Sequence, residues 1–113
     1  MAKLSVSVGI MIVARWSITA KFGKSGEVAS LLKEWSQEFG KQVGFGDINE
    51  ILMIGSIGTT ESKIVNEVQF RTLADLDRAF TQLSTLEGHA AWGKKMSPLV
   101  VSGTNHWEVY RIL

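Results

Sequence analysis

Val8-Gly9-Ile10-Met11-Ile12-Val13-Ala14 is a stretch of seven residues without a polar side chain. Alternate side chains of a β-strand point to opposite faces of its sheet, so a strand with this sequence must bury both faces. The rest of the chain predicts only enough helix to cover one face of a small sheet. The other face therefore needs a partner, and the simplest partner is a second copy of the chain.

Strands and helices are predicted on both sides of this stretch. Apolar residues at helical spacing indicate helices, and alternation bounded by Gly, Ser and Thr indicates strands. Ser25 is the expected N-cap of the first helix, and Gly40 is its expected left-handed end. Thr72 and Asp75 resemble a capping box at the start of the second long helix. The expected elements are strands at about 6–19, 48–57, 63–71 and 104–112, long helices at 26–39 and 73–83, and a short helix at 87–96.

The order strand, helix, strand, strand, helix, strand is the split βαβ pattern of ferredoxin-like domains. We therefore expect an α+β fold in which residues 1–113 form a single domain. Its four-stranded antiparallel sheet carries the helices on one face. The residues expected to form the buried stripe of the second long helix are Leu73, Leu76, Ala79, Phe80 and Leu83.

The phase of the first strand assigns its residues to the two faces of the sheet. Trp16 falls under the helices, whereas Met11 and Val13 fall on the uncovered face. The alternation of the third strand adds Val65 to that face. Monomers rarely expose an apolar patch of this size. We therefore expect two sheets to pack face to face in a homodimer, with Met11, Val13 and Val65 in the interface.

Composition and charge exclude several classes of function. The formal net charge is +1, which gives no electrostatic reason to expect binding to nucleic acid or to acidic membranes. The chain has no cysteine, which removes disulfides, thiol catalysis and thiolate metal sites, and we expect no metal. Ser5 and Arg15 limit the first apolar run too closely for a signal peptide or a membrane span. We expect a cytoplasmic protein with neither nucleic acid nor membrane as a partner.

Three segments carry a resemblance to a known superfamily. They are Leu73-Ala74-Asp75-Leu76 leading to Phe80, then His89-Ala90-Ala91-Trp92, then Ser97-Pro98-Leu99-Val100. Together with the polar and aromatic strand at 105–113, they make the chain resemble the dimeric α/β-barrel proteins, in particular NIPSNAP-like members. The resemblance implies two ferredoxin-like protomers packed sheet on sheet, with ligands bound between sheet and helices. The superfamily includes cofactor-independent antibiotic-biosynthesis monooxygenases, haem-degrading enzymes, small isomerases and lyases, and stress-response proteins, so fold alone does not select an activity.

Five residues are expected to converge on a pocket between sheet and helices: Trp16, Trp35, Asn66, His89 and Trp92. Asn66 is a polar amide on an apolar strand face, and a buried amide needs hydrogen-bond partners, which a ligand could supply. His89 could act as an acid, a base or a haem ligand, because imidazole titrates near neutrality and binds metals. The structural alternative is that the tryptophans are core, that Asn66 bonds a backbone group near a helix end, and that His89 lies on the surface.

A second group of polar residues is expected on the uncovered face. Arg15 and Glu67 fall on neighbouring strands, and a buried pair of this kind must form an ion pair. The group comprises Arg15, Glu67, Gln69 and, in one phase of the last strand, His106, Glu108 and Tyr110. The other phase would place Trp107, Val109 and Arg111 there instead. We interpret the group as an ion-pair cluster that fixes the dimer register, the alternative being a polar site inside the barrel.

Sequence motifs do not decide the chemistry. Gly23-Lys24-Ser25 lacks the earlier glycine of a phosphate-binding loop, since Ile18 occupies that position. A nucleophile elbow is also missing. We expect a protein that binds a small apolar or aromatic molecule without a cofactor. The alternatives are a cofactor-independent monooxygenase or a haem-degrading enzyme, and a non-catalytic stress-response or structural dimer.

Overall fold

The computed structural model describes residues 12–45 and 50–113. The helices in these residues are α2 (Ser25–Glu38), α3 (Leu73–Leu83) and α4 (His89–Met96), with short 3-10 helices η1 (Gly40–Val43) and η3 (Ser97–Leu99). The strands are β1 (Ile12–Thr19), β2 (Glu50–Ile54), β3 (Lys63–Phe70) and β4 (His106–Arg111). The element order confirms the predicted one. Met11 and the predicted first part of the first strand lie outside the described residues.

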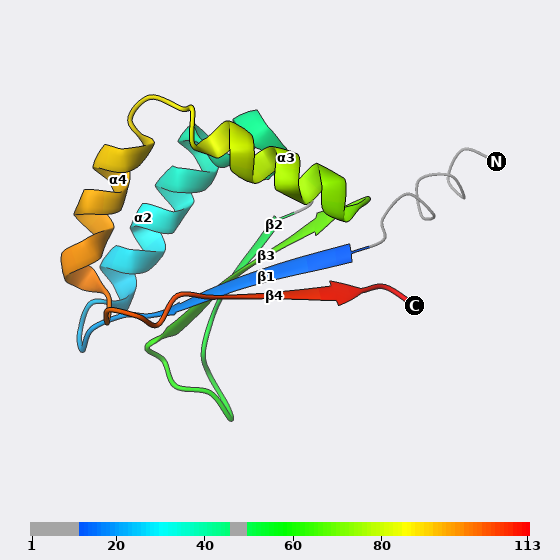
Figure 1. Ribbon diagram of the computed structural model, residues 1–113. Helices are drawn as coiled ribbons and strands as arrows, with labels where there is room; N and C mark the ends of the chain where they lie inside the picture. Colours follow the sequence, from blue (N-terminus) through cyan, green and yellow to red (C-terminus); the bar gives the residue numbers. More distant parts are fainter. Residues whose placement is uncertain (1–11, 46–49) are drawn as a thin grey trace.

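The four strands form one antiparallel sheet in the order β2-β3-β1-β4. All three helices lie on the same side of this sheet, as Figure 1 shows. This arrangement confirms the predicted α+β, ferredoxin-like fold. β1 and β3 occupy the centre of the sheet, and β2 and β4 are its edges. The opposite face of the sheet carries no helix in the described part of the chain (Figure 1).

The strand register assigns each residue to one face, because directly paired residues share a face. Trp16 pairs with Asn66 on one side and with Trp107 on the other, and all three face the helices. Arg15 pairs with Glu67 and Glu108, and these three lie on the uncovered face. The register therefore places His106, Glu108 and Tyr110 with Arg15, and turns Trp107, Val109 and Arg111 toward the helices.

The hydrophobic core fills the space between the sheet and the helices. Ala14 from β1, Ile64 and Val68 from β3, and Val28 from α2 are almost completely buried. Burying a valine or isoleucine side chain stabilises a fold by about 1.5–3 kcal/mol. Helical spacing predicts an apolar stripe for α2 at Val28, Leu31, Leu32, Trp35 and Phe39, and all of these are buried except Leu31, which is half-buried.

The beginning of α2 differs from the prediction. Ser25 is the first helical residue, Lys24 occupies the N-cap position, and the cap residue makes no side-chain capping bond. The hydroxyl of Ser25 donates instead to the carbonyl of Glu61, at 3.1 Å. Ser25 therefore joins the start of α2 to the β2–β3 connection, which is a contact between distant parts of the chain that local sequence rules do not contain.

The end of α2 also differs. Gly40 is not a left-handed cap, because Phe39 remains right-handed and the chain continues through η1 to Gly44, whose φ is 97°. Gly40 serves close packing instead. A Cβ atom on Gly40 would lie 2.9 Å from the ring of Trp35 and 3.0 Å from Phe45. The glycine therefore allows the chain to pass directly against the aromatic cluster described below.

The cap of α3 follows the prediction, but its buried stripe is narrower. The amide of Asp75 donates to the Thr72 hydroxyl at 3.1 Å. Leu76, Ala79 and Leu83 are buried, whereas Leu73 and Phe80 are exposed. Helical side chains lean toward the N-terminus, so Leu73 at the first position has no preceding turn to cover. Phe80 packs instead edge-to-face on Trp107 of β4, with ring centroids 5.0 Å apart.

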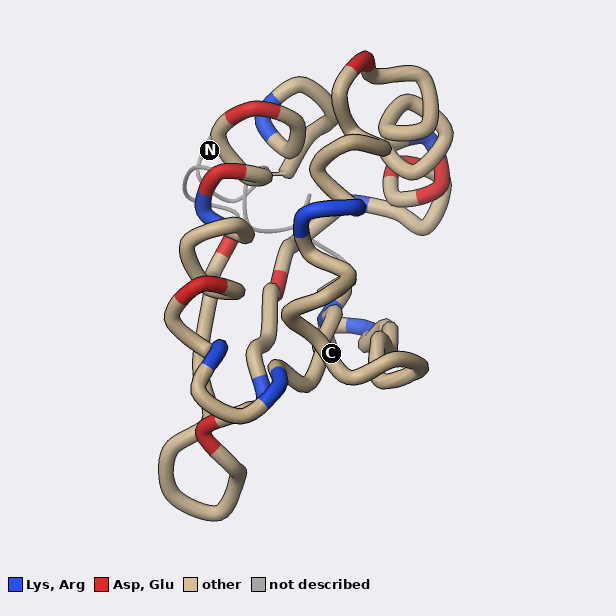
Figure 2. Tube along the Cα trace, turned by 90° about the vertical axis from the view of Figure 1, so that its left-hand side faces the viewer, with Lys and Arg blue, Asp and Glu red and all other residues tan. Residues whose placement is uncertain are grey.

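Charges of both signs alternate over the surface of the molecule. Figure 2 shows basic and acidic residues interspersed along the helices and strands of the described chain. In the same part of the chain, no helix is long and apolar enough to cross a membrane.

Candidate functional site

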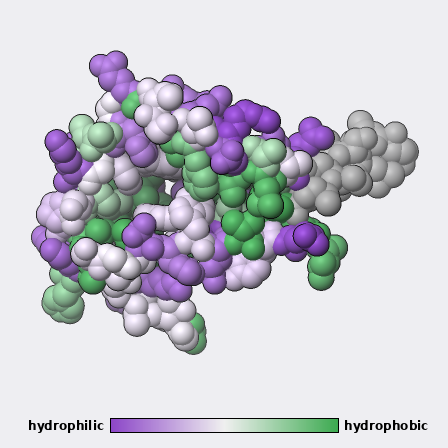
Figure 3. Space-filling model, in the orientation of Figure 1, coloured by the Kyte–Doolittle hydropathy of each residue, from purple (hydrophilic) through white to green (hydrophobic). Residues whose placement is uncertain are grey.

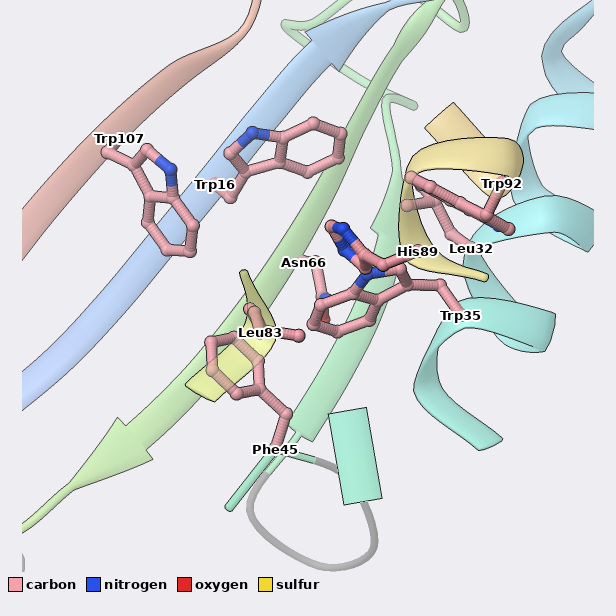
Figure 4. Close-up of a pocket in the computed structure, with 9 residues that line it drawn as sticks. All are labelled: Trp16, Leu32, Trp35, Phe45, Asn66, Leu83, His89, Trp92 and Trp107. Carbon is pink, nitrogen blue, oxygen red and sulfur yellow. The ribbon is translucent and has the colours of Figure 1, made fainter. Parts of the chain in front are cut away.

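A pocket of about 220 Å³ lies between the sheet and the helices. Figure 3 shows this side of the molecule hollowed between the helices and β4. The walls are mostly aromatic and aliphatic, with Asn66 and His89 as polar exceptions. The lining residues are Trp16, Leu32, Trp35, Phe45, Asn66, Leu83, His89, Trp92 and Trp107. All five residues expected at this position therefore line one cavity, and Figure 4 shows them converging from the sheet and the helices.

His89 begins α4 and is held by Trp35 of α2. The indole Nε1 of Trp35 donates to the imidazole Nε2 of His89 at 2.9 Å. Indole nitrogen only donates, so Nε2 must carry the lone pair of a neutral imidazole. The proton of the ring is therefore assigned to Nδ1. His89 is half-buried rather than a surface residue, and its ring also meets Phe39 edge-to-face, with centroids 5.3 Å apart.

Haem does not fit this arrangement of His89. Metal binding requires a lone pair on an imidazole nitrogen. The lone pair of Nε2 already accepts a hydrogen bond from Trp35, and Nδ1 holds the proton. Elsewhere in the described residues, no group of three or more histidine or acidic side chains is placed to hold a metal ion.

Asn66 lies on the floor of the pocket and is only 6% exposed. Its Nδ2 donates to the carboxylate of Glu50 on β2, at 2.7 Å, and not to a backbone group near a helix end. Because a carboxylate only accepts, this bond fixes which end of the amide is nitrogen. The other end, Oδ1, is buried and has no hydrogen-bond partner in the described structure. A buried acceptor without a donor costs about 1–3 kcal/mol, so the unpaired Oδ1 lowers the stability of the fold.

The tryptophans serve packing and enclosure together. Trp92 donates its indole N–H to the carbonyl of Leu31 at 2.9 Å, which anchors α4 to α2. Its ring stacks on His89, with centroids 6.0 Å apart. Trp35 meets Phe45 edge-to-face at 5.1 Å. Trp35 and Trp92 thus pack against their neighbours, and both also line the cavity.

Four lining residues were not predicted for this site: Leu32, Phe45, Leu83 and Trp107. Leu32 and Leu83 were expected as core positions of their helices, so only their exposure to a cavity was missed. Phe45 follows η1 in a segment without periodicity, where pattern rules give no direction. Trp107 was left open with the phase of the last strand, and its pairing with Trp16 is the signal that identifies it.

The polar group on the uncovered face is centred on an ion pair. Arg15 donates from Nε and Nη2 to the same oxygen of Glu67, at 3.0 and 2.8 Å. These hydrogen bonds raise the pKa of the Arg15 guanidinium, which stays charged. The guanidinium carbon also lies 5.2 Å from the ring centroid of Tyr110. On β4, Nε2 of His106 lies 4.0 Å from a carboxylate oxygen of Glu108. Gln69 shares the face, opposite Val13.

Apolar side chains surround this ion pair on the same face. Val13 and Val65 are half-buried at the centre of the sheet. Ile51 and Met53 of β2 share their face, because they pair with Glu67 and Val65, and their exposed fractions are 48% and 38%. Met11, the third predicted interface residue, lies outside the described residues.

Comparison with known proteins identifies the fold of the chain. No family model and no curated protein match its sequence. A NIPSNAP family protein from Agrobacterium tumefaciens is similar in structure, with a TM-score of 0.73, 19% identity, and 88% of this chain and 90% of that chain covered. A second NIPSNAP family protein from the same organism, of unknown function, has a TM-score of 0.75 and 14% identity, with 92% of this chain and 89% of that chain covered. A cofactor-independent oxygenase from Streptomyces nogalater, solved as a mutant, has a TM-score of 0.61 and 15% identity, with 88% of this chain and 90% of that chain covered. The chain therefore has the ferredoxin-like fold that these proteins share.

Proposed function

We propose that the protein binds a small apolar or aromatic molecule in the pocket between its sheet and its helices. The observation that carries this proposal is the cavity of about 220 Å³ itself, whose walls are aromatic and aliphatic apart from Asn66 and His89. Small-molecule sites are typically apolar cavities with a few placed polar groups, which is the composition found here.

Size and shape support an aromatic ligand. An apolar protein cavity of about 150 Å³ holds one benzene molecule, so the larger cavity here suits a molecule of about two rings. Its walls include Trp16, Trp35, Trp92 and Trp107, whose rings can stack on or meet the edges of another aromatic ring.

The binding experiment is calorimetric titration with two-ring aromatics such as naphthalene and 2-naphthol, compared between two variants. Leu83→Phe adds volume inside the cavity and should abolish binding. Ala91→Phe places the same side chain on the exposed surface of α4 and should leave binding unchanged. Equal affinity in both variants would contradict the pocket as the binding site, and heatless titrations with the unmodified protein would contradict the proposal itself.

A cofactor-independent oxygenase is the second candidate function. The likeness to the Streptomyces nogalater oxygenase favours it, as does the donor that His89 offers at Nδ1. A fixed donor can stabilise the negative charge that develops on a substrate oxygen when an electron-rich aromatic reacts with dioxygen. Oxygen uptake with a panel of phenolic two-ring substrates tests this function. If no phenol that binds causes oxygen uptake, the oxygenase function is contradicted and only the binding function remains.

We further propose a cofactor-free homodimer that forms sheet to sheet. Val13, Val65, Ile51 and Met53 on the uncovered face support the dimer, since packing two such faces removes apolar surface from water. The engaged lone pair of His89 supports binding without haem. The lack of cysteine is compatible with a cytoplasmic location. Sedimentation measures whether the protein is a dimer, and titration with haemin measures whether it binds haem.

A further inference from the structure

The apolar lining of the pocket continues onto the surface of the molecule, between α3 and β4. Trp107 of β4 lines the pocket, and Phe80 of α3 packs edge-to-face on it, with ring centroids 5.0 Å apart. Leu83, about one turn further along α3, also lines the pocket. The same two elements therefore form one wall of the pocket and carry apolar side chains outward from it.

Leu73 and Val109 extend this surface away from the pocket. Leu73 lies two turns before Phe80, so both side chains are on one side of α3. Val109 follows Trp107 on the side of β4 that faces the helices. The exposed fractions are 62% for Leu73, 38% for Phe80, 37% for Trp107 and 45% for Val109. We call these four residues the apolar strip, and Figure 3 shows apolar surface between α3 and β4 beside the hollow of the pocket.

The position of the apolar strip narrows what can cover it. The strip lies on the helix side of the sheet, so a dimer that forms through the opposite face would leave it in water. Exposed apolar side chains that lie together mark binding surfaces, unlike single ones scattered over a protein. Trp107 belongs to both the pocket and the strip, so one ligand can contact both. The next residue on this side of β4 is Arg111, which ends the apolar run about 13 Å from Trp107.

We propose that the ligand of the pocket is an aromatic molecule with an alkyl chain, and that the chain lies along the apolar strip. The rings occupy the cavity, and the chain runs past Trp107 toward Val109 and Leu73. This inference rests on the proposed binding function and adds the class of ligand to it. A fully buried CH₂ group strengthens binding about fourfold. Because the strip covers a chain from one side only, the gain here is about twofold for each CH₂ group.

The test is a titration with 2-naphthol and with two derivatives that carry an ethyl or a hexyl chain at the far end of the second ring. We expect the hexyl derivative to bind about tenfold or more tightly than the ethyl derivative. Val109→Ser and Leu73→Ser remove apolar surface from the strip and should reduce this ratio severalfold. Val101→Ser is the matched control, because Val101 is also an exposed valine, at 41%, but lies in the connection before β4. It should leave the ratio unchanged.

The outcomes separate this inference from the proposed function. If 2-naphthol binds and the chain adds nothing, or if Val109→Ser and Val101→Ser give the same ratio, the inference is overturned and aromatic binding remains. If none of the three compounds binds, both are overturned.

Two further results would also overturn the inference. A hexyl derivative that still binds Leu83→Phe, where 2-naphthol does not, would show that the chain binds independently of the pocket. A change of sedimentation coefficient in Val109→Ser, with the ratio of affinities unaltered, would show that a second copy of the chain covers the strip instead.

Discussion

At the scale of single residues, Asn66 is a polar side chain whose burial costs stability. Its Oδ1 is buried without a partner, and its Nδ2 bonds the half-exposed Glu50. Leucine has the same branched arrangement of heavy atoms and no polar atom, so Asn66→Leu removes the unpaired acceptor and leaves Glu50 to water. We expect the free energy of unfolding to rise by about 1 kcal/mol. Urea unfolding measures it, and a loss of stability would show that the bond to Glu50 is worth more than the unpaired oxygen costs.

The sequence indicated which residues enter the pocket but not which groups they present. Trp16 and Asn66 were placed by alternation along their strands, and Trp35 by the apolar stripe of α2. The bond from Trp35 to His89 joins residues 54 positions apart, and the bond from Asn66 to Glu50 depends on the register of β2. Both are tertiary contacts, so no local rule could have given the tautomer of His89 or the free oxygen of Asn66.

At the scale of elements, the start of α3 is the clearest case of a local rule that holds. The Thr72 hydroxyl accepts from the amide of Asp75, and Asp75 pairs with Arg78 at 2.9 Å. We expect Thr72→Ala to lower the free energy of unfolding by about 1 kcal/mol. The matched control is Ser25→Ala, whose hydroxyl caps no helix and bonds Glu61 at the surface, and which should cost less. Thermal unfolding of the two variants compares them, and a larger loss in Ser25→Ala would contradict this account of the caps.

Element boundaries and faces were predictable where one side of an element is buried. β1 and β3 alternate because the helices cover one face, and their phases follow from sequence. All six residues of β4 are exposed, so burial selected no phase for it. Only the pairing of Trp107 with Trp16, and its contact with Phe80, turn β4 toward the pocket. Likewise the chain continues from Gly40 into η1 instead of ending in a left-handed cap, because the glycine is needed for its closeness to Trp35 and not for its backbone angles.

At the scale of the whole molecule, the uncovered sheet face makes the proposed dimer testable. Met53 of β2 is 38% exposed on that face, and Val101, which lies in the connection before β4, is 41% exposed. We expect Met53→Asp to abolish dimerisation, because the dimer would bury an unpaired charge, and Val101→Asp to leave it unchanged. Sedimentation at micromolar concentration distinguishes the two. A monomeric unmodified protein, or equal effects of both variants, would contradict the sheet-to-sheet arrangement.

The contribution of the Arg15–Glu67 ion pair to stability should depend on whether the dimer forms. In an isolated protomer the two side chains are 41% and 16% exposed, and such a pair contributes at most about 1 kcal/mol. Enclosed between two sheets, the pair would be buried, and removal of one partner would cost about 3–5 kcal/mol. We expect Glu67→Gln to destabilise the unmodified dimer strongly, and the monomeric Met53→Asp variant only weakly.

A double-mutant cycle with Arg15→Met and Glu67→Gln in both backgrounds measures this difference, because it isolates the energy between the two side chains. The coupling should be large where the sheets are packed together and small in the monomeric variant. The same small coupling in both backgrounds would show that Arg15 and Glu67 remain in water. The uncovered face would then not be the interface, even if the protein were a dimer.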